Sequence, residues 1–305
     1  MWLVLAFCSA ALLGFYDVFK KLALRDNAVL PVLFLNTMIC SLLFLPFILL
    51  STYTGVLDGS TFYVEACGWN EHKYIVLKAL IVLSSWVFGY FAMKNLPITI
   101  VGPINATRPV MVLVGAMLVF GERLNVWQWC GVLLAIVSFF LLSRSGKKEG
   151  VDFKHNKWIF SLVLAAVLGA VSGLYDKYLM APPDNGGVGL SRMVVQSWYN
   201  IYQLFMMGLT MLLIWWPTRK KTTRFQWRWS IIFISIFLSI ADFVYFYALS
   251  LPGAMISIVS MVRRGSVVVS FFCGAAVFKE KNLSSKAIDM LLVLLGMIFL
   301  YIGTR

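Results

Sequence analysis

The chain has 305 residues, of which 61% are hydrophobic and only 13% are charged, and its mean hydropathy is +0.85. Soluble domains are roughly 45–50% apolar and about 25% charged, so the composition excludes a water-soluble globular protein. The formal net charge of +13 does not indicate a nucleic-acid-binding protein. Its bases fall mainly in short loops between apolar segments, where Lys and Arg determine membrane topology.

The apolar segments predict ten membrane-spanning helices, because each is close to the ~20 residues that a bilayer requires. The expected spans lie near residues 2–19, 30–50, 74–93, 97–119, 124–143, 158–180, 193–216, 230–250, 253–278 and 285–303. Pro97 and Pro252 stand at the start of the fourth and ninth spans, where the first helical turn tolerates proline. The predicted fold class is an all-α polytopic membrane protein.

The spans divide into two halves joined by a basic segment. We expect a first five-helix repeat at residues 1–143, a basic linker at residues 144–157 and a second five-helix repeat at residues 158–305. Because each half holds an odd number of spans, the second half enters the bilayer in the opposite direction to the first. Inverted repeats of this kind are typical of secondary transporters, which bind substrate near the bilayer midplane between the halves.

Short motifs occur at corresponding places in the two halves. Gly-Phe-Tyr-Asp at residues 14–17 is matched by Gly-Leu-Tyr-Asp at residues 173–176. A Leu-Pro pair precedes Arg108 in the first half, and another precedes Arg263 and its neighbour Arg264 in the second half with the same spacing to Arg263. These matches support the prediction of two inverted repeats.

Lysine and arginine are concentrated in the loops that follow odd-numbered spans. Because cytoplasmic loops are enriched in these bases, the positive-inside rule places those loops in the cytoplasm and both chain termini outside. The longest stretch between spans, residues 52–72, follows an even-numbered span and is therefore expected on the outer side.

Three arginines lie at membrane depth. Arg108 is about 16 Å along the fourth span from Pro97, near the middle of a hydrocarbon core about 30 Å thick, and Arg263 and Arg264 have the same depth in the ninth span. A charge there costs at least ~2.5–3.5 kcal/mol and usually serves a function. Since a guanidinium matches carboxylate or phosphate, we expect an anionic or zwitterionic substrate. The predicted substrate-binding residues are Arg108, Arg264, Arg263, Asn105, Trp86 and Tyr90.

Asp242, near the middle of the eighth span, offers a purely structural alternative. It would pair with one of the arginines and fix helix packing. One carboxylate does not neutralise three guanidiniums, so at least one arginine is expected to be free for a ligand. Adjacent helical residues diverge by about 100°, so Arg263 and Arg264 do not both point into one cavity.

Two further carboxylates, Asp17 and Asp176, are expected on opposite sides of the central cavity as alternating gates or proton sites. The predicted gating or proton-coupling residues are Asp17, Asp176, Asp242, Tyr16 and Tyr175. The alternative is ordinary ion pairing, of Asp17 with Lys20 or Lys21 and of Asp176 with a neighbouring base. Lys78, near the start of the third span, is expected to extend its amine to the membrane interface.

Two motifs at equivalent places, Phe-Gly-Glu-Arg-Leu at 120–124 and Phe-Lys-Glu-Lys-Asn at 278–282, close the fourth and ninth spans. With ten spans in two halves, the chain resembles the drug/metabolite transporter superfamily, and more closely its EamA branch, typified by bacterial metabolite exporters. The resemblance implies alternating access through a cavity lined by spans three, four, eight and nine. The matching positions are Trp86, Arg108, Asp242, Arg263 and Arg264. Typical members have both termini inside, opposite to the orientation that the charges indicate here.

The predicted function is secondary active export of a small metabolite, an organic anion or amino acid, with proton coupling or exchange. The alternative is a flippase for a lipid-linked phosphate head group. A membrane enzyme is disfavoured, because the only histidines, His72 and His155, fall in expected loops and no nucleophile–base pair stands out. We expect no cofactor, metal or nucleic acid. The expected partners are a small-molecule substrate and the lipid bilayer. A monomer suffices, although a dimer is compatible, and the expected location is a bacterial inner membrane.

Overall fold

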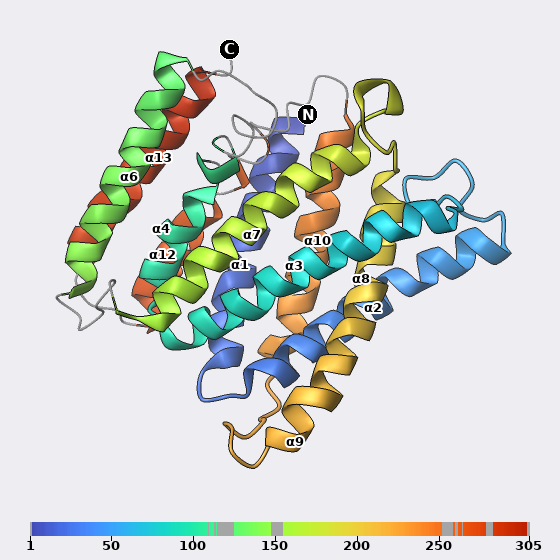
Figure 1. Cartoon of the computed structure of the whole chain (residues 1–305), viewed down its shortest axis with the longest axis horizontal. Helices are drawn as coiled ribbons and strands as arrows, with labels where there is room; N and C mark the ends of the chain where they lie inside the picture. Colours follow the sequence, from blue (N-terminus) through green and yellow to red (C-terminus); the bar gives the residue numbers. More distant parts are fainter. Residues whose placement is uncertain are drawn as a thin grey trace.

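The structure is a computed structural model that describes residues 2–108, 110–112, 114, 125–147, 155–251, 259, 262–263, 265–278 and 283–303. Within these ranges all regular structure is helical and there is no strand. The helices are α1 (Trp2–Leu24), α2 (Val29–Tyr53), α3 (Trp69–Asn95), α4 (Ile98–Ala106), α6 (Val126–Lys147), α7 (Lys157–Met180), η1 (Pro183–Asn185), α8 (Arg192–Thr210), η2 (Met211–Trp215), α9 (Trp216–Thr218), α10 (Ser230–Ser250), α12 (Ser266–Phe278) and α13 (Leu283–Ile302), as Figure 1 shows.

Six of these helical segments are long and apolar enough to cross a membrane. They are α1, α2, α3, α7, the continuous segment from α8 through α9, and α10. Shorter apolar stretches lie in α6, α12 and α13. The prediction of an all-α, multi-pass membrane protein is therefore confirmed.

Helix α1 continues beyond the expected end of the first span, through Lys20 and Lys21 to Leu24. Both bases have partners within the fold. The Lys20 Nζ lies 2.7 Å from Asp17 Oδ1, and the Lys21 Nζ donates to the carbonyl oxygens of Met93 and Leu96 at the end of α3. Because these ammonium groups are hydrogen-bonded, the helix does not need to end where the apolar run ends.

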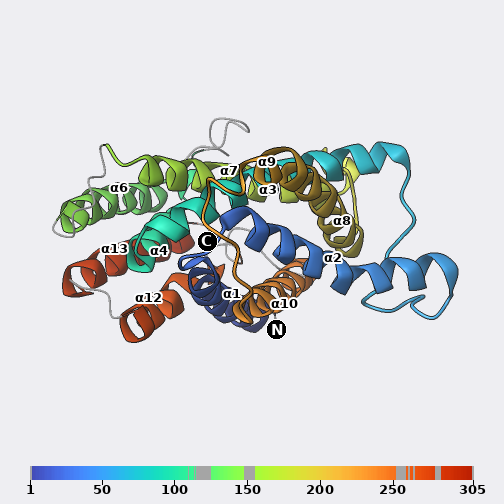
Figure 2. The same cartoon turned by 90° about the horizontal axis from the view of Figure 1, so that it is seen from below.

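The helices pack in pairs that join the two ends of the sequence. Helix α1 lies against α10 and α12, α7 lies against α3 and α4, α2 lies against α8 and α10, and α3 also contacts α8 (Figures 1 and 2). Helices α6 and α13 pair with each other at one edge of the molecule, and α4 contacts α12. The bundle therefore interleaves the first and second halves of the chain.

Serine hydroxyls connect several of these pairs. Ser9 of α1 donates to the carbonyl oxygen of Ala241 in α10 at 2.7 Å, and Ser85 of α3 donates to that of Ala165 in α7 at the same distance. Such bonds are common between membrane helices, where small polar residues allow close approach. Gly14 serves the same purpose, because a Cβ there would lie 2.5 Å from Val269 Cβ of α12.

Candidate functional site

A cavity of about 180 Å³ lies inside the bundle between α1, α3, α4, α7, α8, α10 and α12. Its wall is rich in charged side chains, although it is surrounded by membrane-spanning helices. The charged residues that line it are Asp17, Lys20, Lys78, Arg108, Asp176, Asp242 and Arg263. Because charges at membrane depth are costly unless paired or used, the partner of each one decides what the cavity does.

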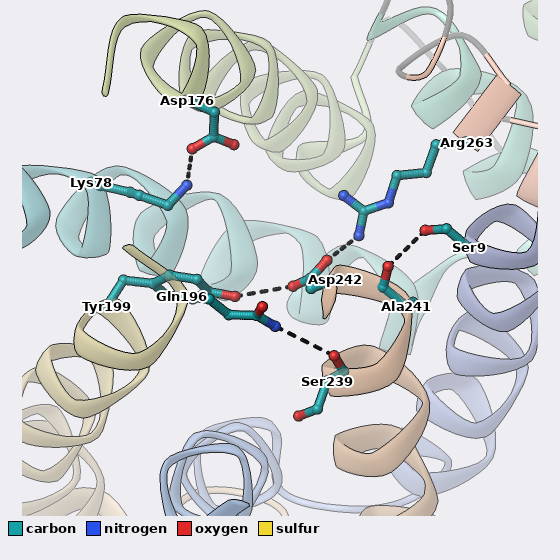
Figure 3. A network of polar contacts seen from close by, with 9 residues as sticks. All are labelled: Ser9, Lys78, Asp176, Gln196, Tyr199, Ser239, Ala241, Asp242 and Arg263. Carbon is teal, nitrogen blue, oxygen red and sulfur yellow. Dashed lines mark hydrogen bonds and ion pairs between the residues drawn. The ribbon is translucent and has the colours of Figure 1, made fainter. Parts of the chain in front are cut away.

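The first ion pair joins α3 to α7. The Lys78 Nζ donates to Asp176 Oδ1, and both residues are buried (Figure 3). The Lys78 ammonium also lies 5.2 Å from the ring centroid of Tyr199 and 5.8 Å from that of Phe246, close enough for cation–π attraction. This pair connects the two halves of the chain within the cavity wall.

The second ion pair joins α10 to the segment that precedes α12. Nη2 of Arg263 donates to Asp242 Oδ1, while the Tyr199 hydroxyl donates to Oδ2 at 3.0 Å (Figure 3). The Arg263 guanidinium also lies 4.2 Å from the ring centroid of Tyr245. Both oxygens of the Asp242 carboxylate are therefore engaged.

The third ion pair lies within α1. The Lys20 Nζ is 2.7 Å from Asp17 Oδ1, one helical turn away, and 4.3 Å from the ring centroid of Tyr16. The ammonium also lies 5.4 Å from the ring of Tyr90 in α3. Unlike the other two pairs, this one does not connect different helices.

Arg108 differs from the other bases of the cavity, because it makes no ion pair with any residue that the structure describes. Its buried Nε has no hydrogen-bond partner, and neither has Oδ1 of Asn105 in the preceding turn. The guanidinium lies directly against the backbone of α7 at Gly169, where an added Cβ would stand 2.7 Å from Cζ and Nη1. The cavity therefore holds a guanidinium with no carboxylate of the described residues within ion-pair distance.

Comparison with protein families matches residues 1–144 to the sequence model of the EamA-like transporter family. Residues 1–144 belong to this family, which is part of the drug/metabolite transporter superfamily. The resemblance noted from the spans and motifs is thereby confirmed. Members of this family are membrane transporters.

A solved crystal structure of another protein is similar to the chain along almost its whole length. The TM-score is 0.60 at 16% sequence identity, and the match covers 98% of each chain. At this identity the likeness concerns the fold alone. The comparison with curated proteins finds no match.

The cavity brings most of the predicted site residues together. From the predicted set, its wall contains Tyr16, Asp17, Trp86, Tyr90, Asn105, Arg108, Asp176, Asp242 and Arg263. Tyr175 does not line it in the part of the chain that the structure describes. The Tyr175 hydroxyl instead donates to the carbonyl oxygen of Tyr74 at 3.3 Å. Arg264 lies outside the described residues.

The expectation for Lys78 is wrong, because its amine does not reach the interface and is 3% exposed. Helix α3 begins at Trp69, several residues before the expected span, so Lys78 lies in the third helical turn and not close to the start of the helix. Sequence reasoning also missed Tyr199 of α8, which binds Asp242, and Gly169, which contacts Arg108. The sequence marks Lys78, because it is a base within an apolar run. No sequence feature marks Tyr199 as a partner of Asp242 or Gly169 as a neighbour of Arg108.

Proposed function

We propose that the protein is a secondary active transporter of a small organic anion or amino acid, working by alternating access. The observation that supports this proposal best is the Arg108 guanidinium, which lies in a membrane-embedded cavity without a carboxylate partner among the described residues. A guanidinium keeps its charge and matches a carboxylate or phosphate. An anionic substrate supplies the missing counter-charge.

The packing of the helices supports two inverted repeats, residues 1–143 and 158–305, as the framework of transport. Exchanging the halves replaces α1 by α7, α2 by α8, α3 by α10 and α6 by α13, and it replaces the fourth expected span, which contains α4, by the ninth, which contains α12. The observed contact of α1 with α10 then becomes that of α7 with α3, and α2 with α10 becomes α8 with α3. The pairs α2–α8 and α6–α13 map onto themselves, as does the contact between the fourth and ninth spans that α4 and α12 make. A pseudo-two-fold axis through the cavity accounts for this pattern.

Within this proposal the carboxylates differ in role. The Lys78–Asp176 pair connects α3 to α7, so a rearrangement that separates these helices must break it. We assign this pair to a gate on one side of the cavity. The Asp17–Lys20 pair is internal to α1 and moves with it, so Asp17 is the better candidate for a proton or exchange site.

Replacing Arg108 by glutamine tests the proposed substrate site. A ligand at 100 times its dissociation constant stabilises a protein by ~2.7 kcal/mol, which is measurable as a higher melting temperature. We expect the purified wild type to be stabilised by one class of carboxylate or phosphate compound and Arg108→Gln to lose this response. Lys220→Gln, which removes an exposed base outside the cavity, is the matched control and should respond like the wild type.

An equal response of Arg108→Gln and the wild type would overturn the assignment of Arg108. A wild type that ignores every soluble anion but is stabilised by a lipid-linked phosphate would favour the flippase. Transport in proteoliposomes then establishes the direction of movement and whether a pH gradient drives it.

Cys67 provides a test of the orientation. We propose that both termini and the segment between α2 and α3 lie on the outer side, and that the membrane is a bacterial inner membrane. Burial raises the pKa of the Cys67 thiol above its ordinary value, and the nearby Glu71 carboxylate raises it further. Because the thiolate is the reactive form, labelling should be slow at pH 7 and faster at pH 9.

The measurement uses a variant that retains Cys67 alone, treated in intact spheroplasts with a membrane-impermeant maleimide. We expect labelling without permeabilisation, with a rate that rises with pH. A variant without cysteines gives the background. Labelling that requires permeabilisation would show the opposite orientation, with the termini inside.

A further inference from the structure

The charges of the cavity wall point to the charge of the substrate. Among the described lining residues, the bases are Lys20, Lys78, Arg108 and Arg263, and the acids are Asp17, Asp176 and Asp242. The bases thus exceed the acids by one. A buried base that already pairs with a carboxylate of the protein is not free to pair with an anionic substrate. The ion pairs of the wall therefore determine which base is available to a substrate.

Every acid of this wall is already engaged by a base from the protein. Asp17 binds Lys20, Asp176 binds Lys78, and Asp242 binds Arg263 and the Tyr199 hydroxyl. Among the lining residues that the structure describes, the positive charge that remains is on Arg108. A substrate with one anionic group neutralises it, whereas a second anionic group has no unpaired base among the described residues. An ammonium group on the substrate likewise has no unpaired carboxylate there.

The position of the Arg108 guanidinium depends on a glycine in the opposite wall. A Cβ added to Gly169 of α7 would stand 2.7 Å from Cζ, 2.7 Å from Nη1 and 3.0 Å from Nε of Arg108, so any side chain at this position displaces the guanidinium. Gly173, one turn further along the same helix, also lines the cavity. A Cβ there would meet only Val112 Cγ2, at an ordinary contact distance of 4.0 Å.

We propose that Arg108, positioned on the bare backbone of Gly169, forms a subsite for one anionic group, and that the cavity therefore selects a monoanion such as a monocarboxylate. This proposal rests on the proposed function and narrows its substrate class. Gly169 is a positioning residue, since it acts through the guanidinium and not on the substrate. A dicarboxylate or a phosphate dianion would bring an unpaired charge into a low-dielectric site, where it is costly.

The test compares three probes of equal carbon length: butyrate, which carries one negative charge, succinate, which carries two, and 4-aminobutyrate, a zwitterion. Their dissociation constants for the purified full-length protein are measured by calorimetry at constant pH and ionic strength. We expect butyrate to bind about tenfold more tightly than either of the others. The ranking needs only the wild type, so it holds as a test even where a variant does not fold.

The variants Arg108→Gln, Gly169→Ala and Gly173→Ala test the geometry. We expect Arg108→Gln to weaken butyrate binding by about tenfold to a hundredfold, which is what the loss of a charged hydrogen bond gives. Gly169→Ala should weaken it by about tenfold while leaving the melting temperature of the free protein close to that of the wild type, because the displaced group is the flexible end of a side chain. Gly173→Ala should stay within about twofold of the wild type.

The outcomes separate this inference from the proposed function. If no probe binds the wild type, the monoanion assignment is overturned, while the proposed function is decided by the wider set of carboxylate and phosphate compounds. If the probes bind and Arg108→Gln abolishes binding, but succinate or 4-aminobutyrate binds as tightly as butyrate, the monoanion assignment is wrong while the transporter proposal stands. Equal effects of Gly169→Ala and Gly173→Ala would overturn the positioning role of Gly169.

Discussion

Replacing Lys78 by methionine is expected to lower the free energy of unfolding by about 3–5 kcal/mol, the usual result of removing one partner from a buried ion pair. The Lys78 side chain is 3% exposed and that of Asp176 is 12% exposed. Methionine fills a similar volume but leaves the Asp176 carboxylate without its counter-charge. Unfolding in detergent micelles, followed by denaturant or heat, measures the loss.

A double variant shows whether the cost comes from the unpaired charge. Lys78→Met combined with Asp176→Leu removes both charges, and we expect it to recover most of the stability, because apolar replacements of buried pairs are often neutral. Lys73→Met, which changes an exposed lysine near the start of the same helix, is the matched control. A Lys78→Met variant as stable as Lys73→Met would contradict the buried pair.

Asp242→Asn is expected to have the second large effect. The amide oxygen still accepts a hydrogen bond from the Tyr199 hydroxyl, but the Arg263 guanidinium loses its counter-charge. We expect a loss of about 3–5 kcal/mol in the free energy of unfolding. The wall would then carry two uncompensated positive charges among its described residues, so binding of succinate should increase relative to butyrate.

Tyr199→Phe separates the hydrogen bond from the charge. It removes the donor to Asp242 and should cost about 1.5–3 kcal/mol, the range for hydrogen bonds to charged groups, without changing the preference between butyrate and succinate. Asp242→Asn with Arg263→Gln restores one uncompensated charge and should restore the preference for butyrate. An unaltered preference in Asp242→Asn would contradict the link between wall charge and substrate charge.

The helical spans and the depth of the charges could be predicted because they depend only on the order of residues along the chain. A run of apolar residues fixes where a helix crosses the bilayer, and the rise of about 1.5 Å per residue fixes how deep Arg108 lies in it. Lys78 shows the limit of this reasoning. A starting point misplaced by a few residues moved it from a deep turn of α3 to the membrane interface.

Which charged side chains form ion pairs with one another could not be predicted in the same way. Two lysines one turn from Asp17 were equivalent in the sequence, yet only Lys20 binds it, while Lys21 reaches the carbonyl oxygens of Met93 and Leu96. Adjacent residues on a helix point about 100° apart, so the packing of α1 against its neighbours decides which one meets the carboxylate. The partner of Asp176, Lys78 on another helix, depended on packing in the same way.

The sequence by itself determined that this is a helical membrane protein whose first 144 residues match the EamA-like transporter family. It also determined that several charges lie deep within the spans, because composition and spacing are properties of the chain alone. Only the tertiary structure decided which of these charges neutralise one another. It placed Lys78 beside Asp176 and Arg263 beside Asp242, and it set Arg108 against Gly169. Ion pairs between helices depend on how each helix is rotated and where it crosses its neighbours. That arrangement leaves the Arg108 guanidinium without an ion pair among the described residues.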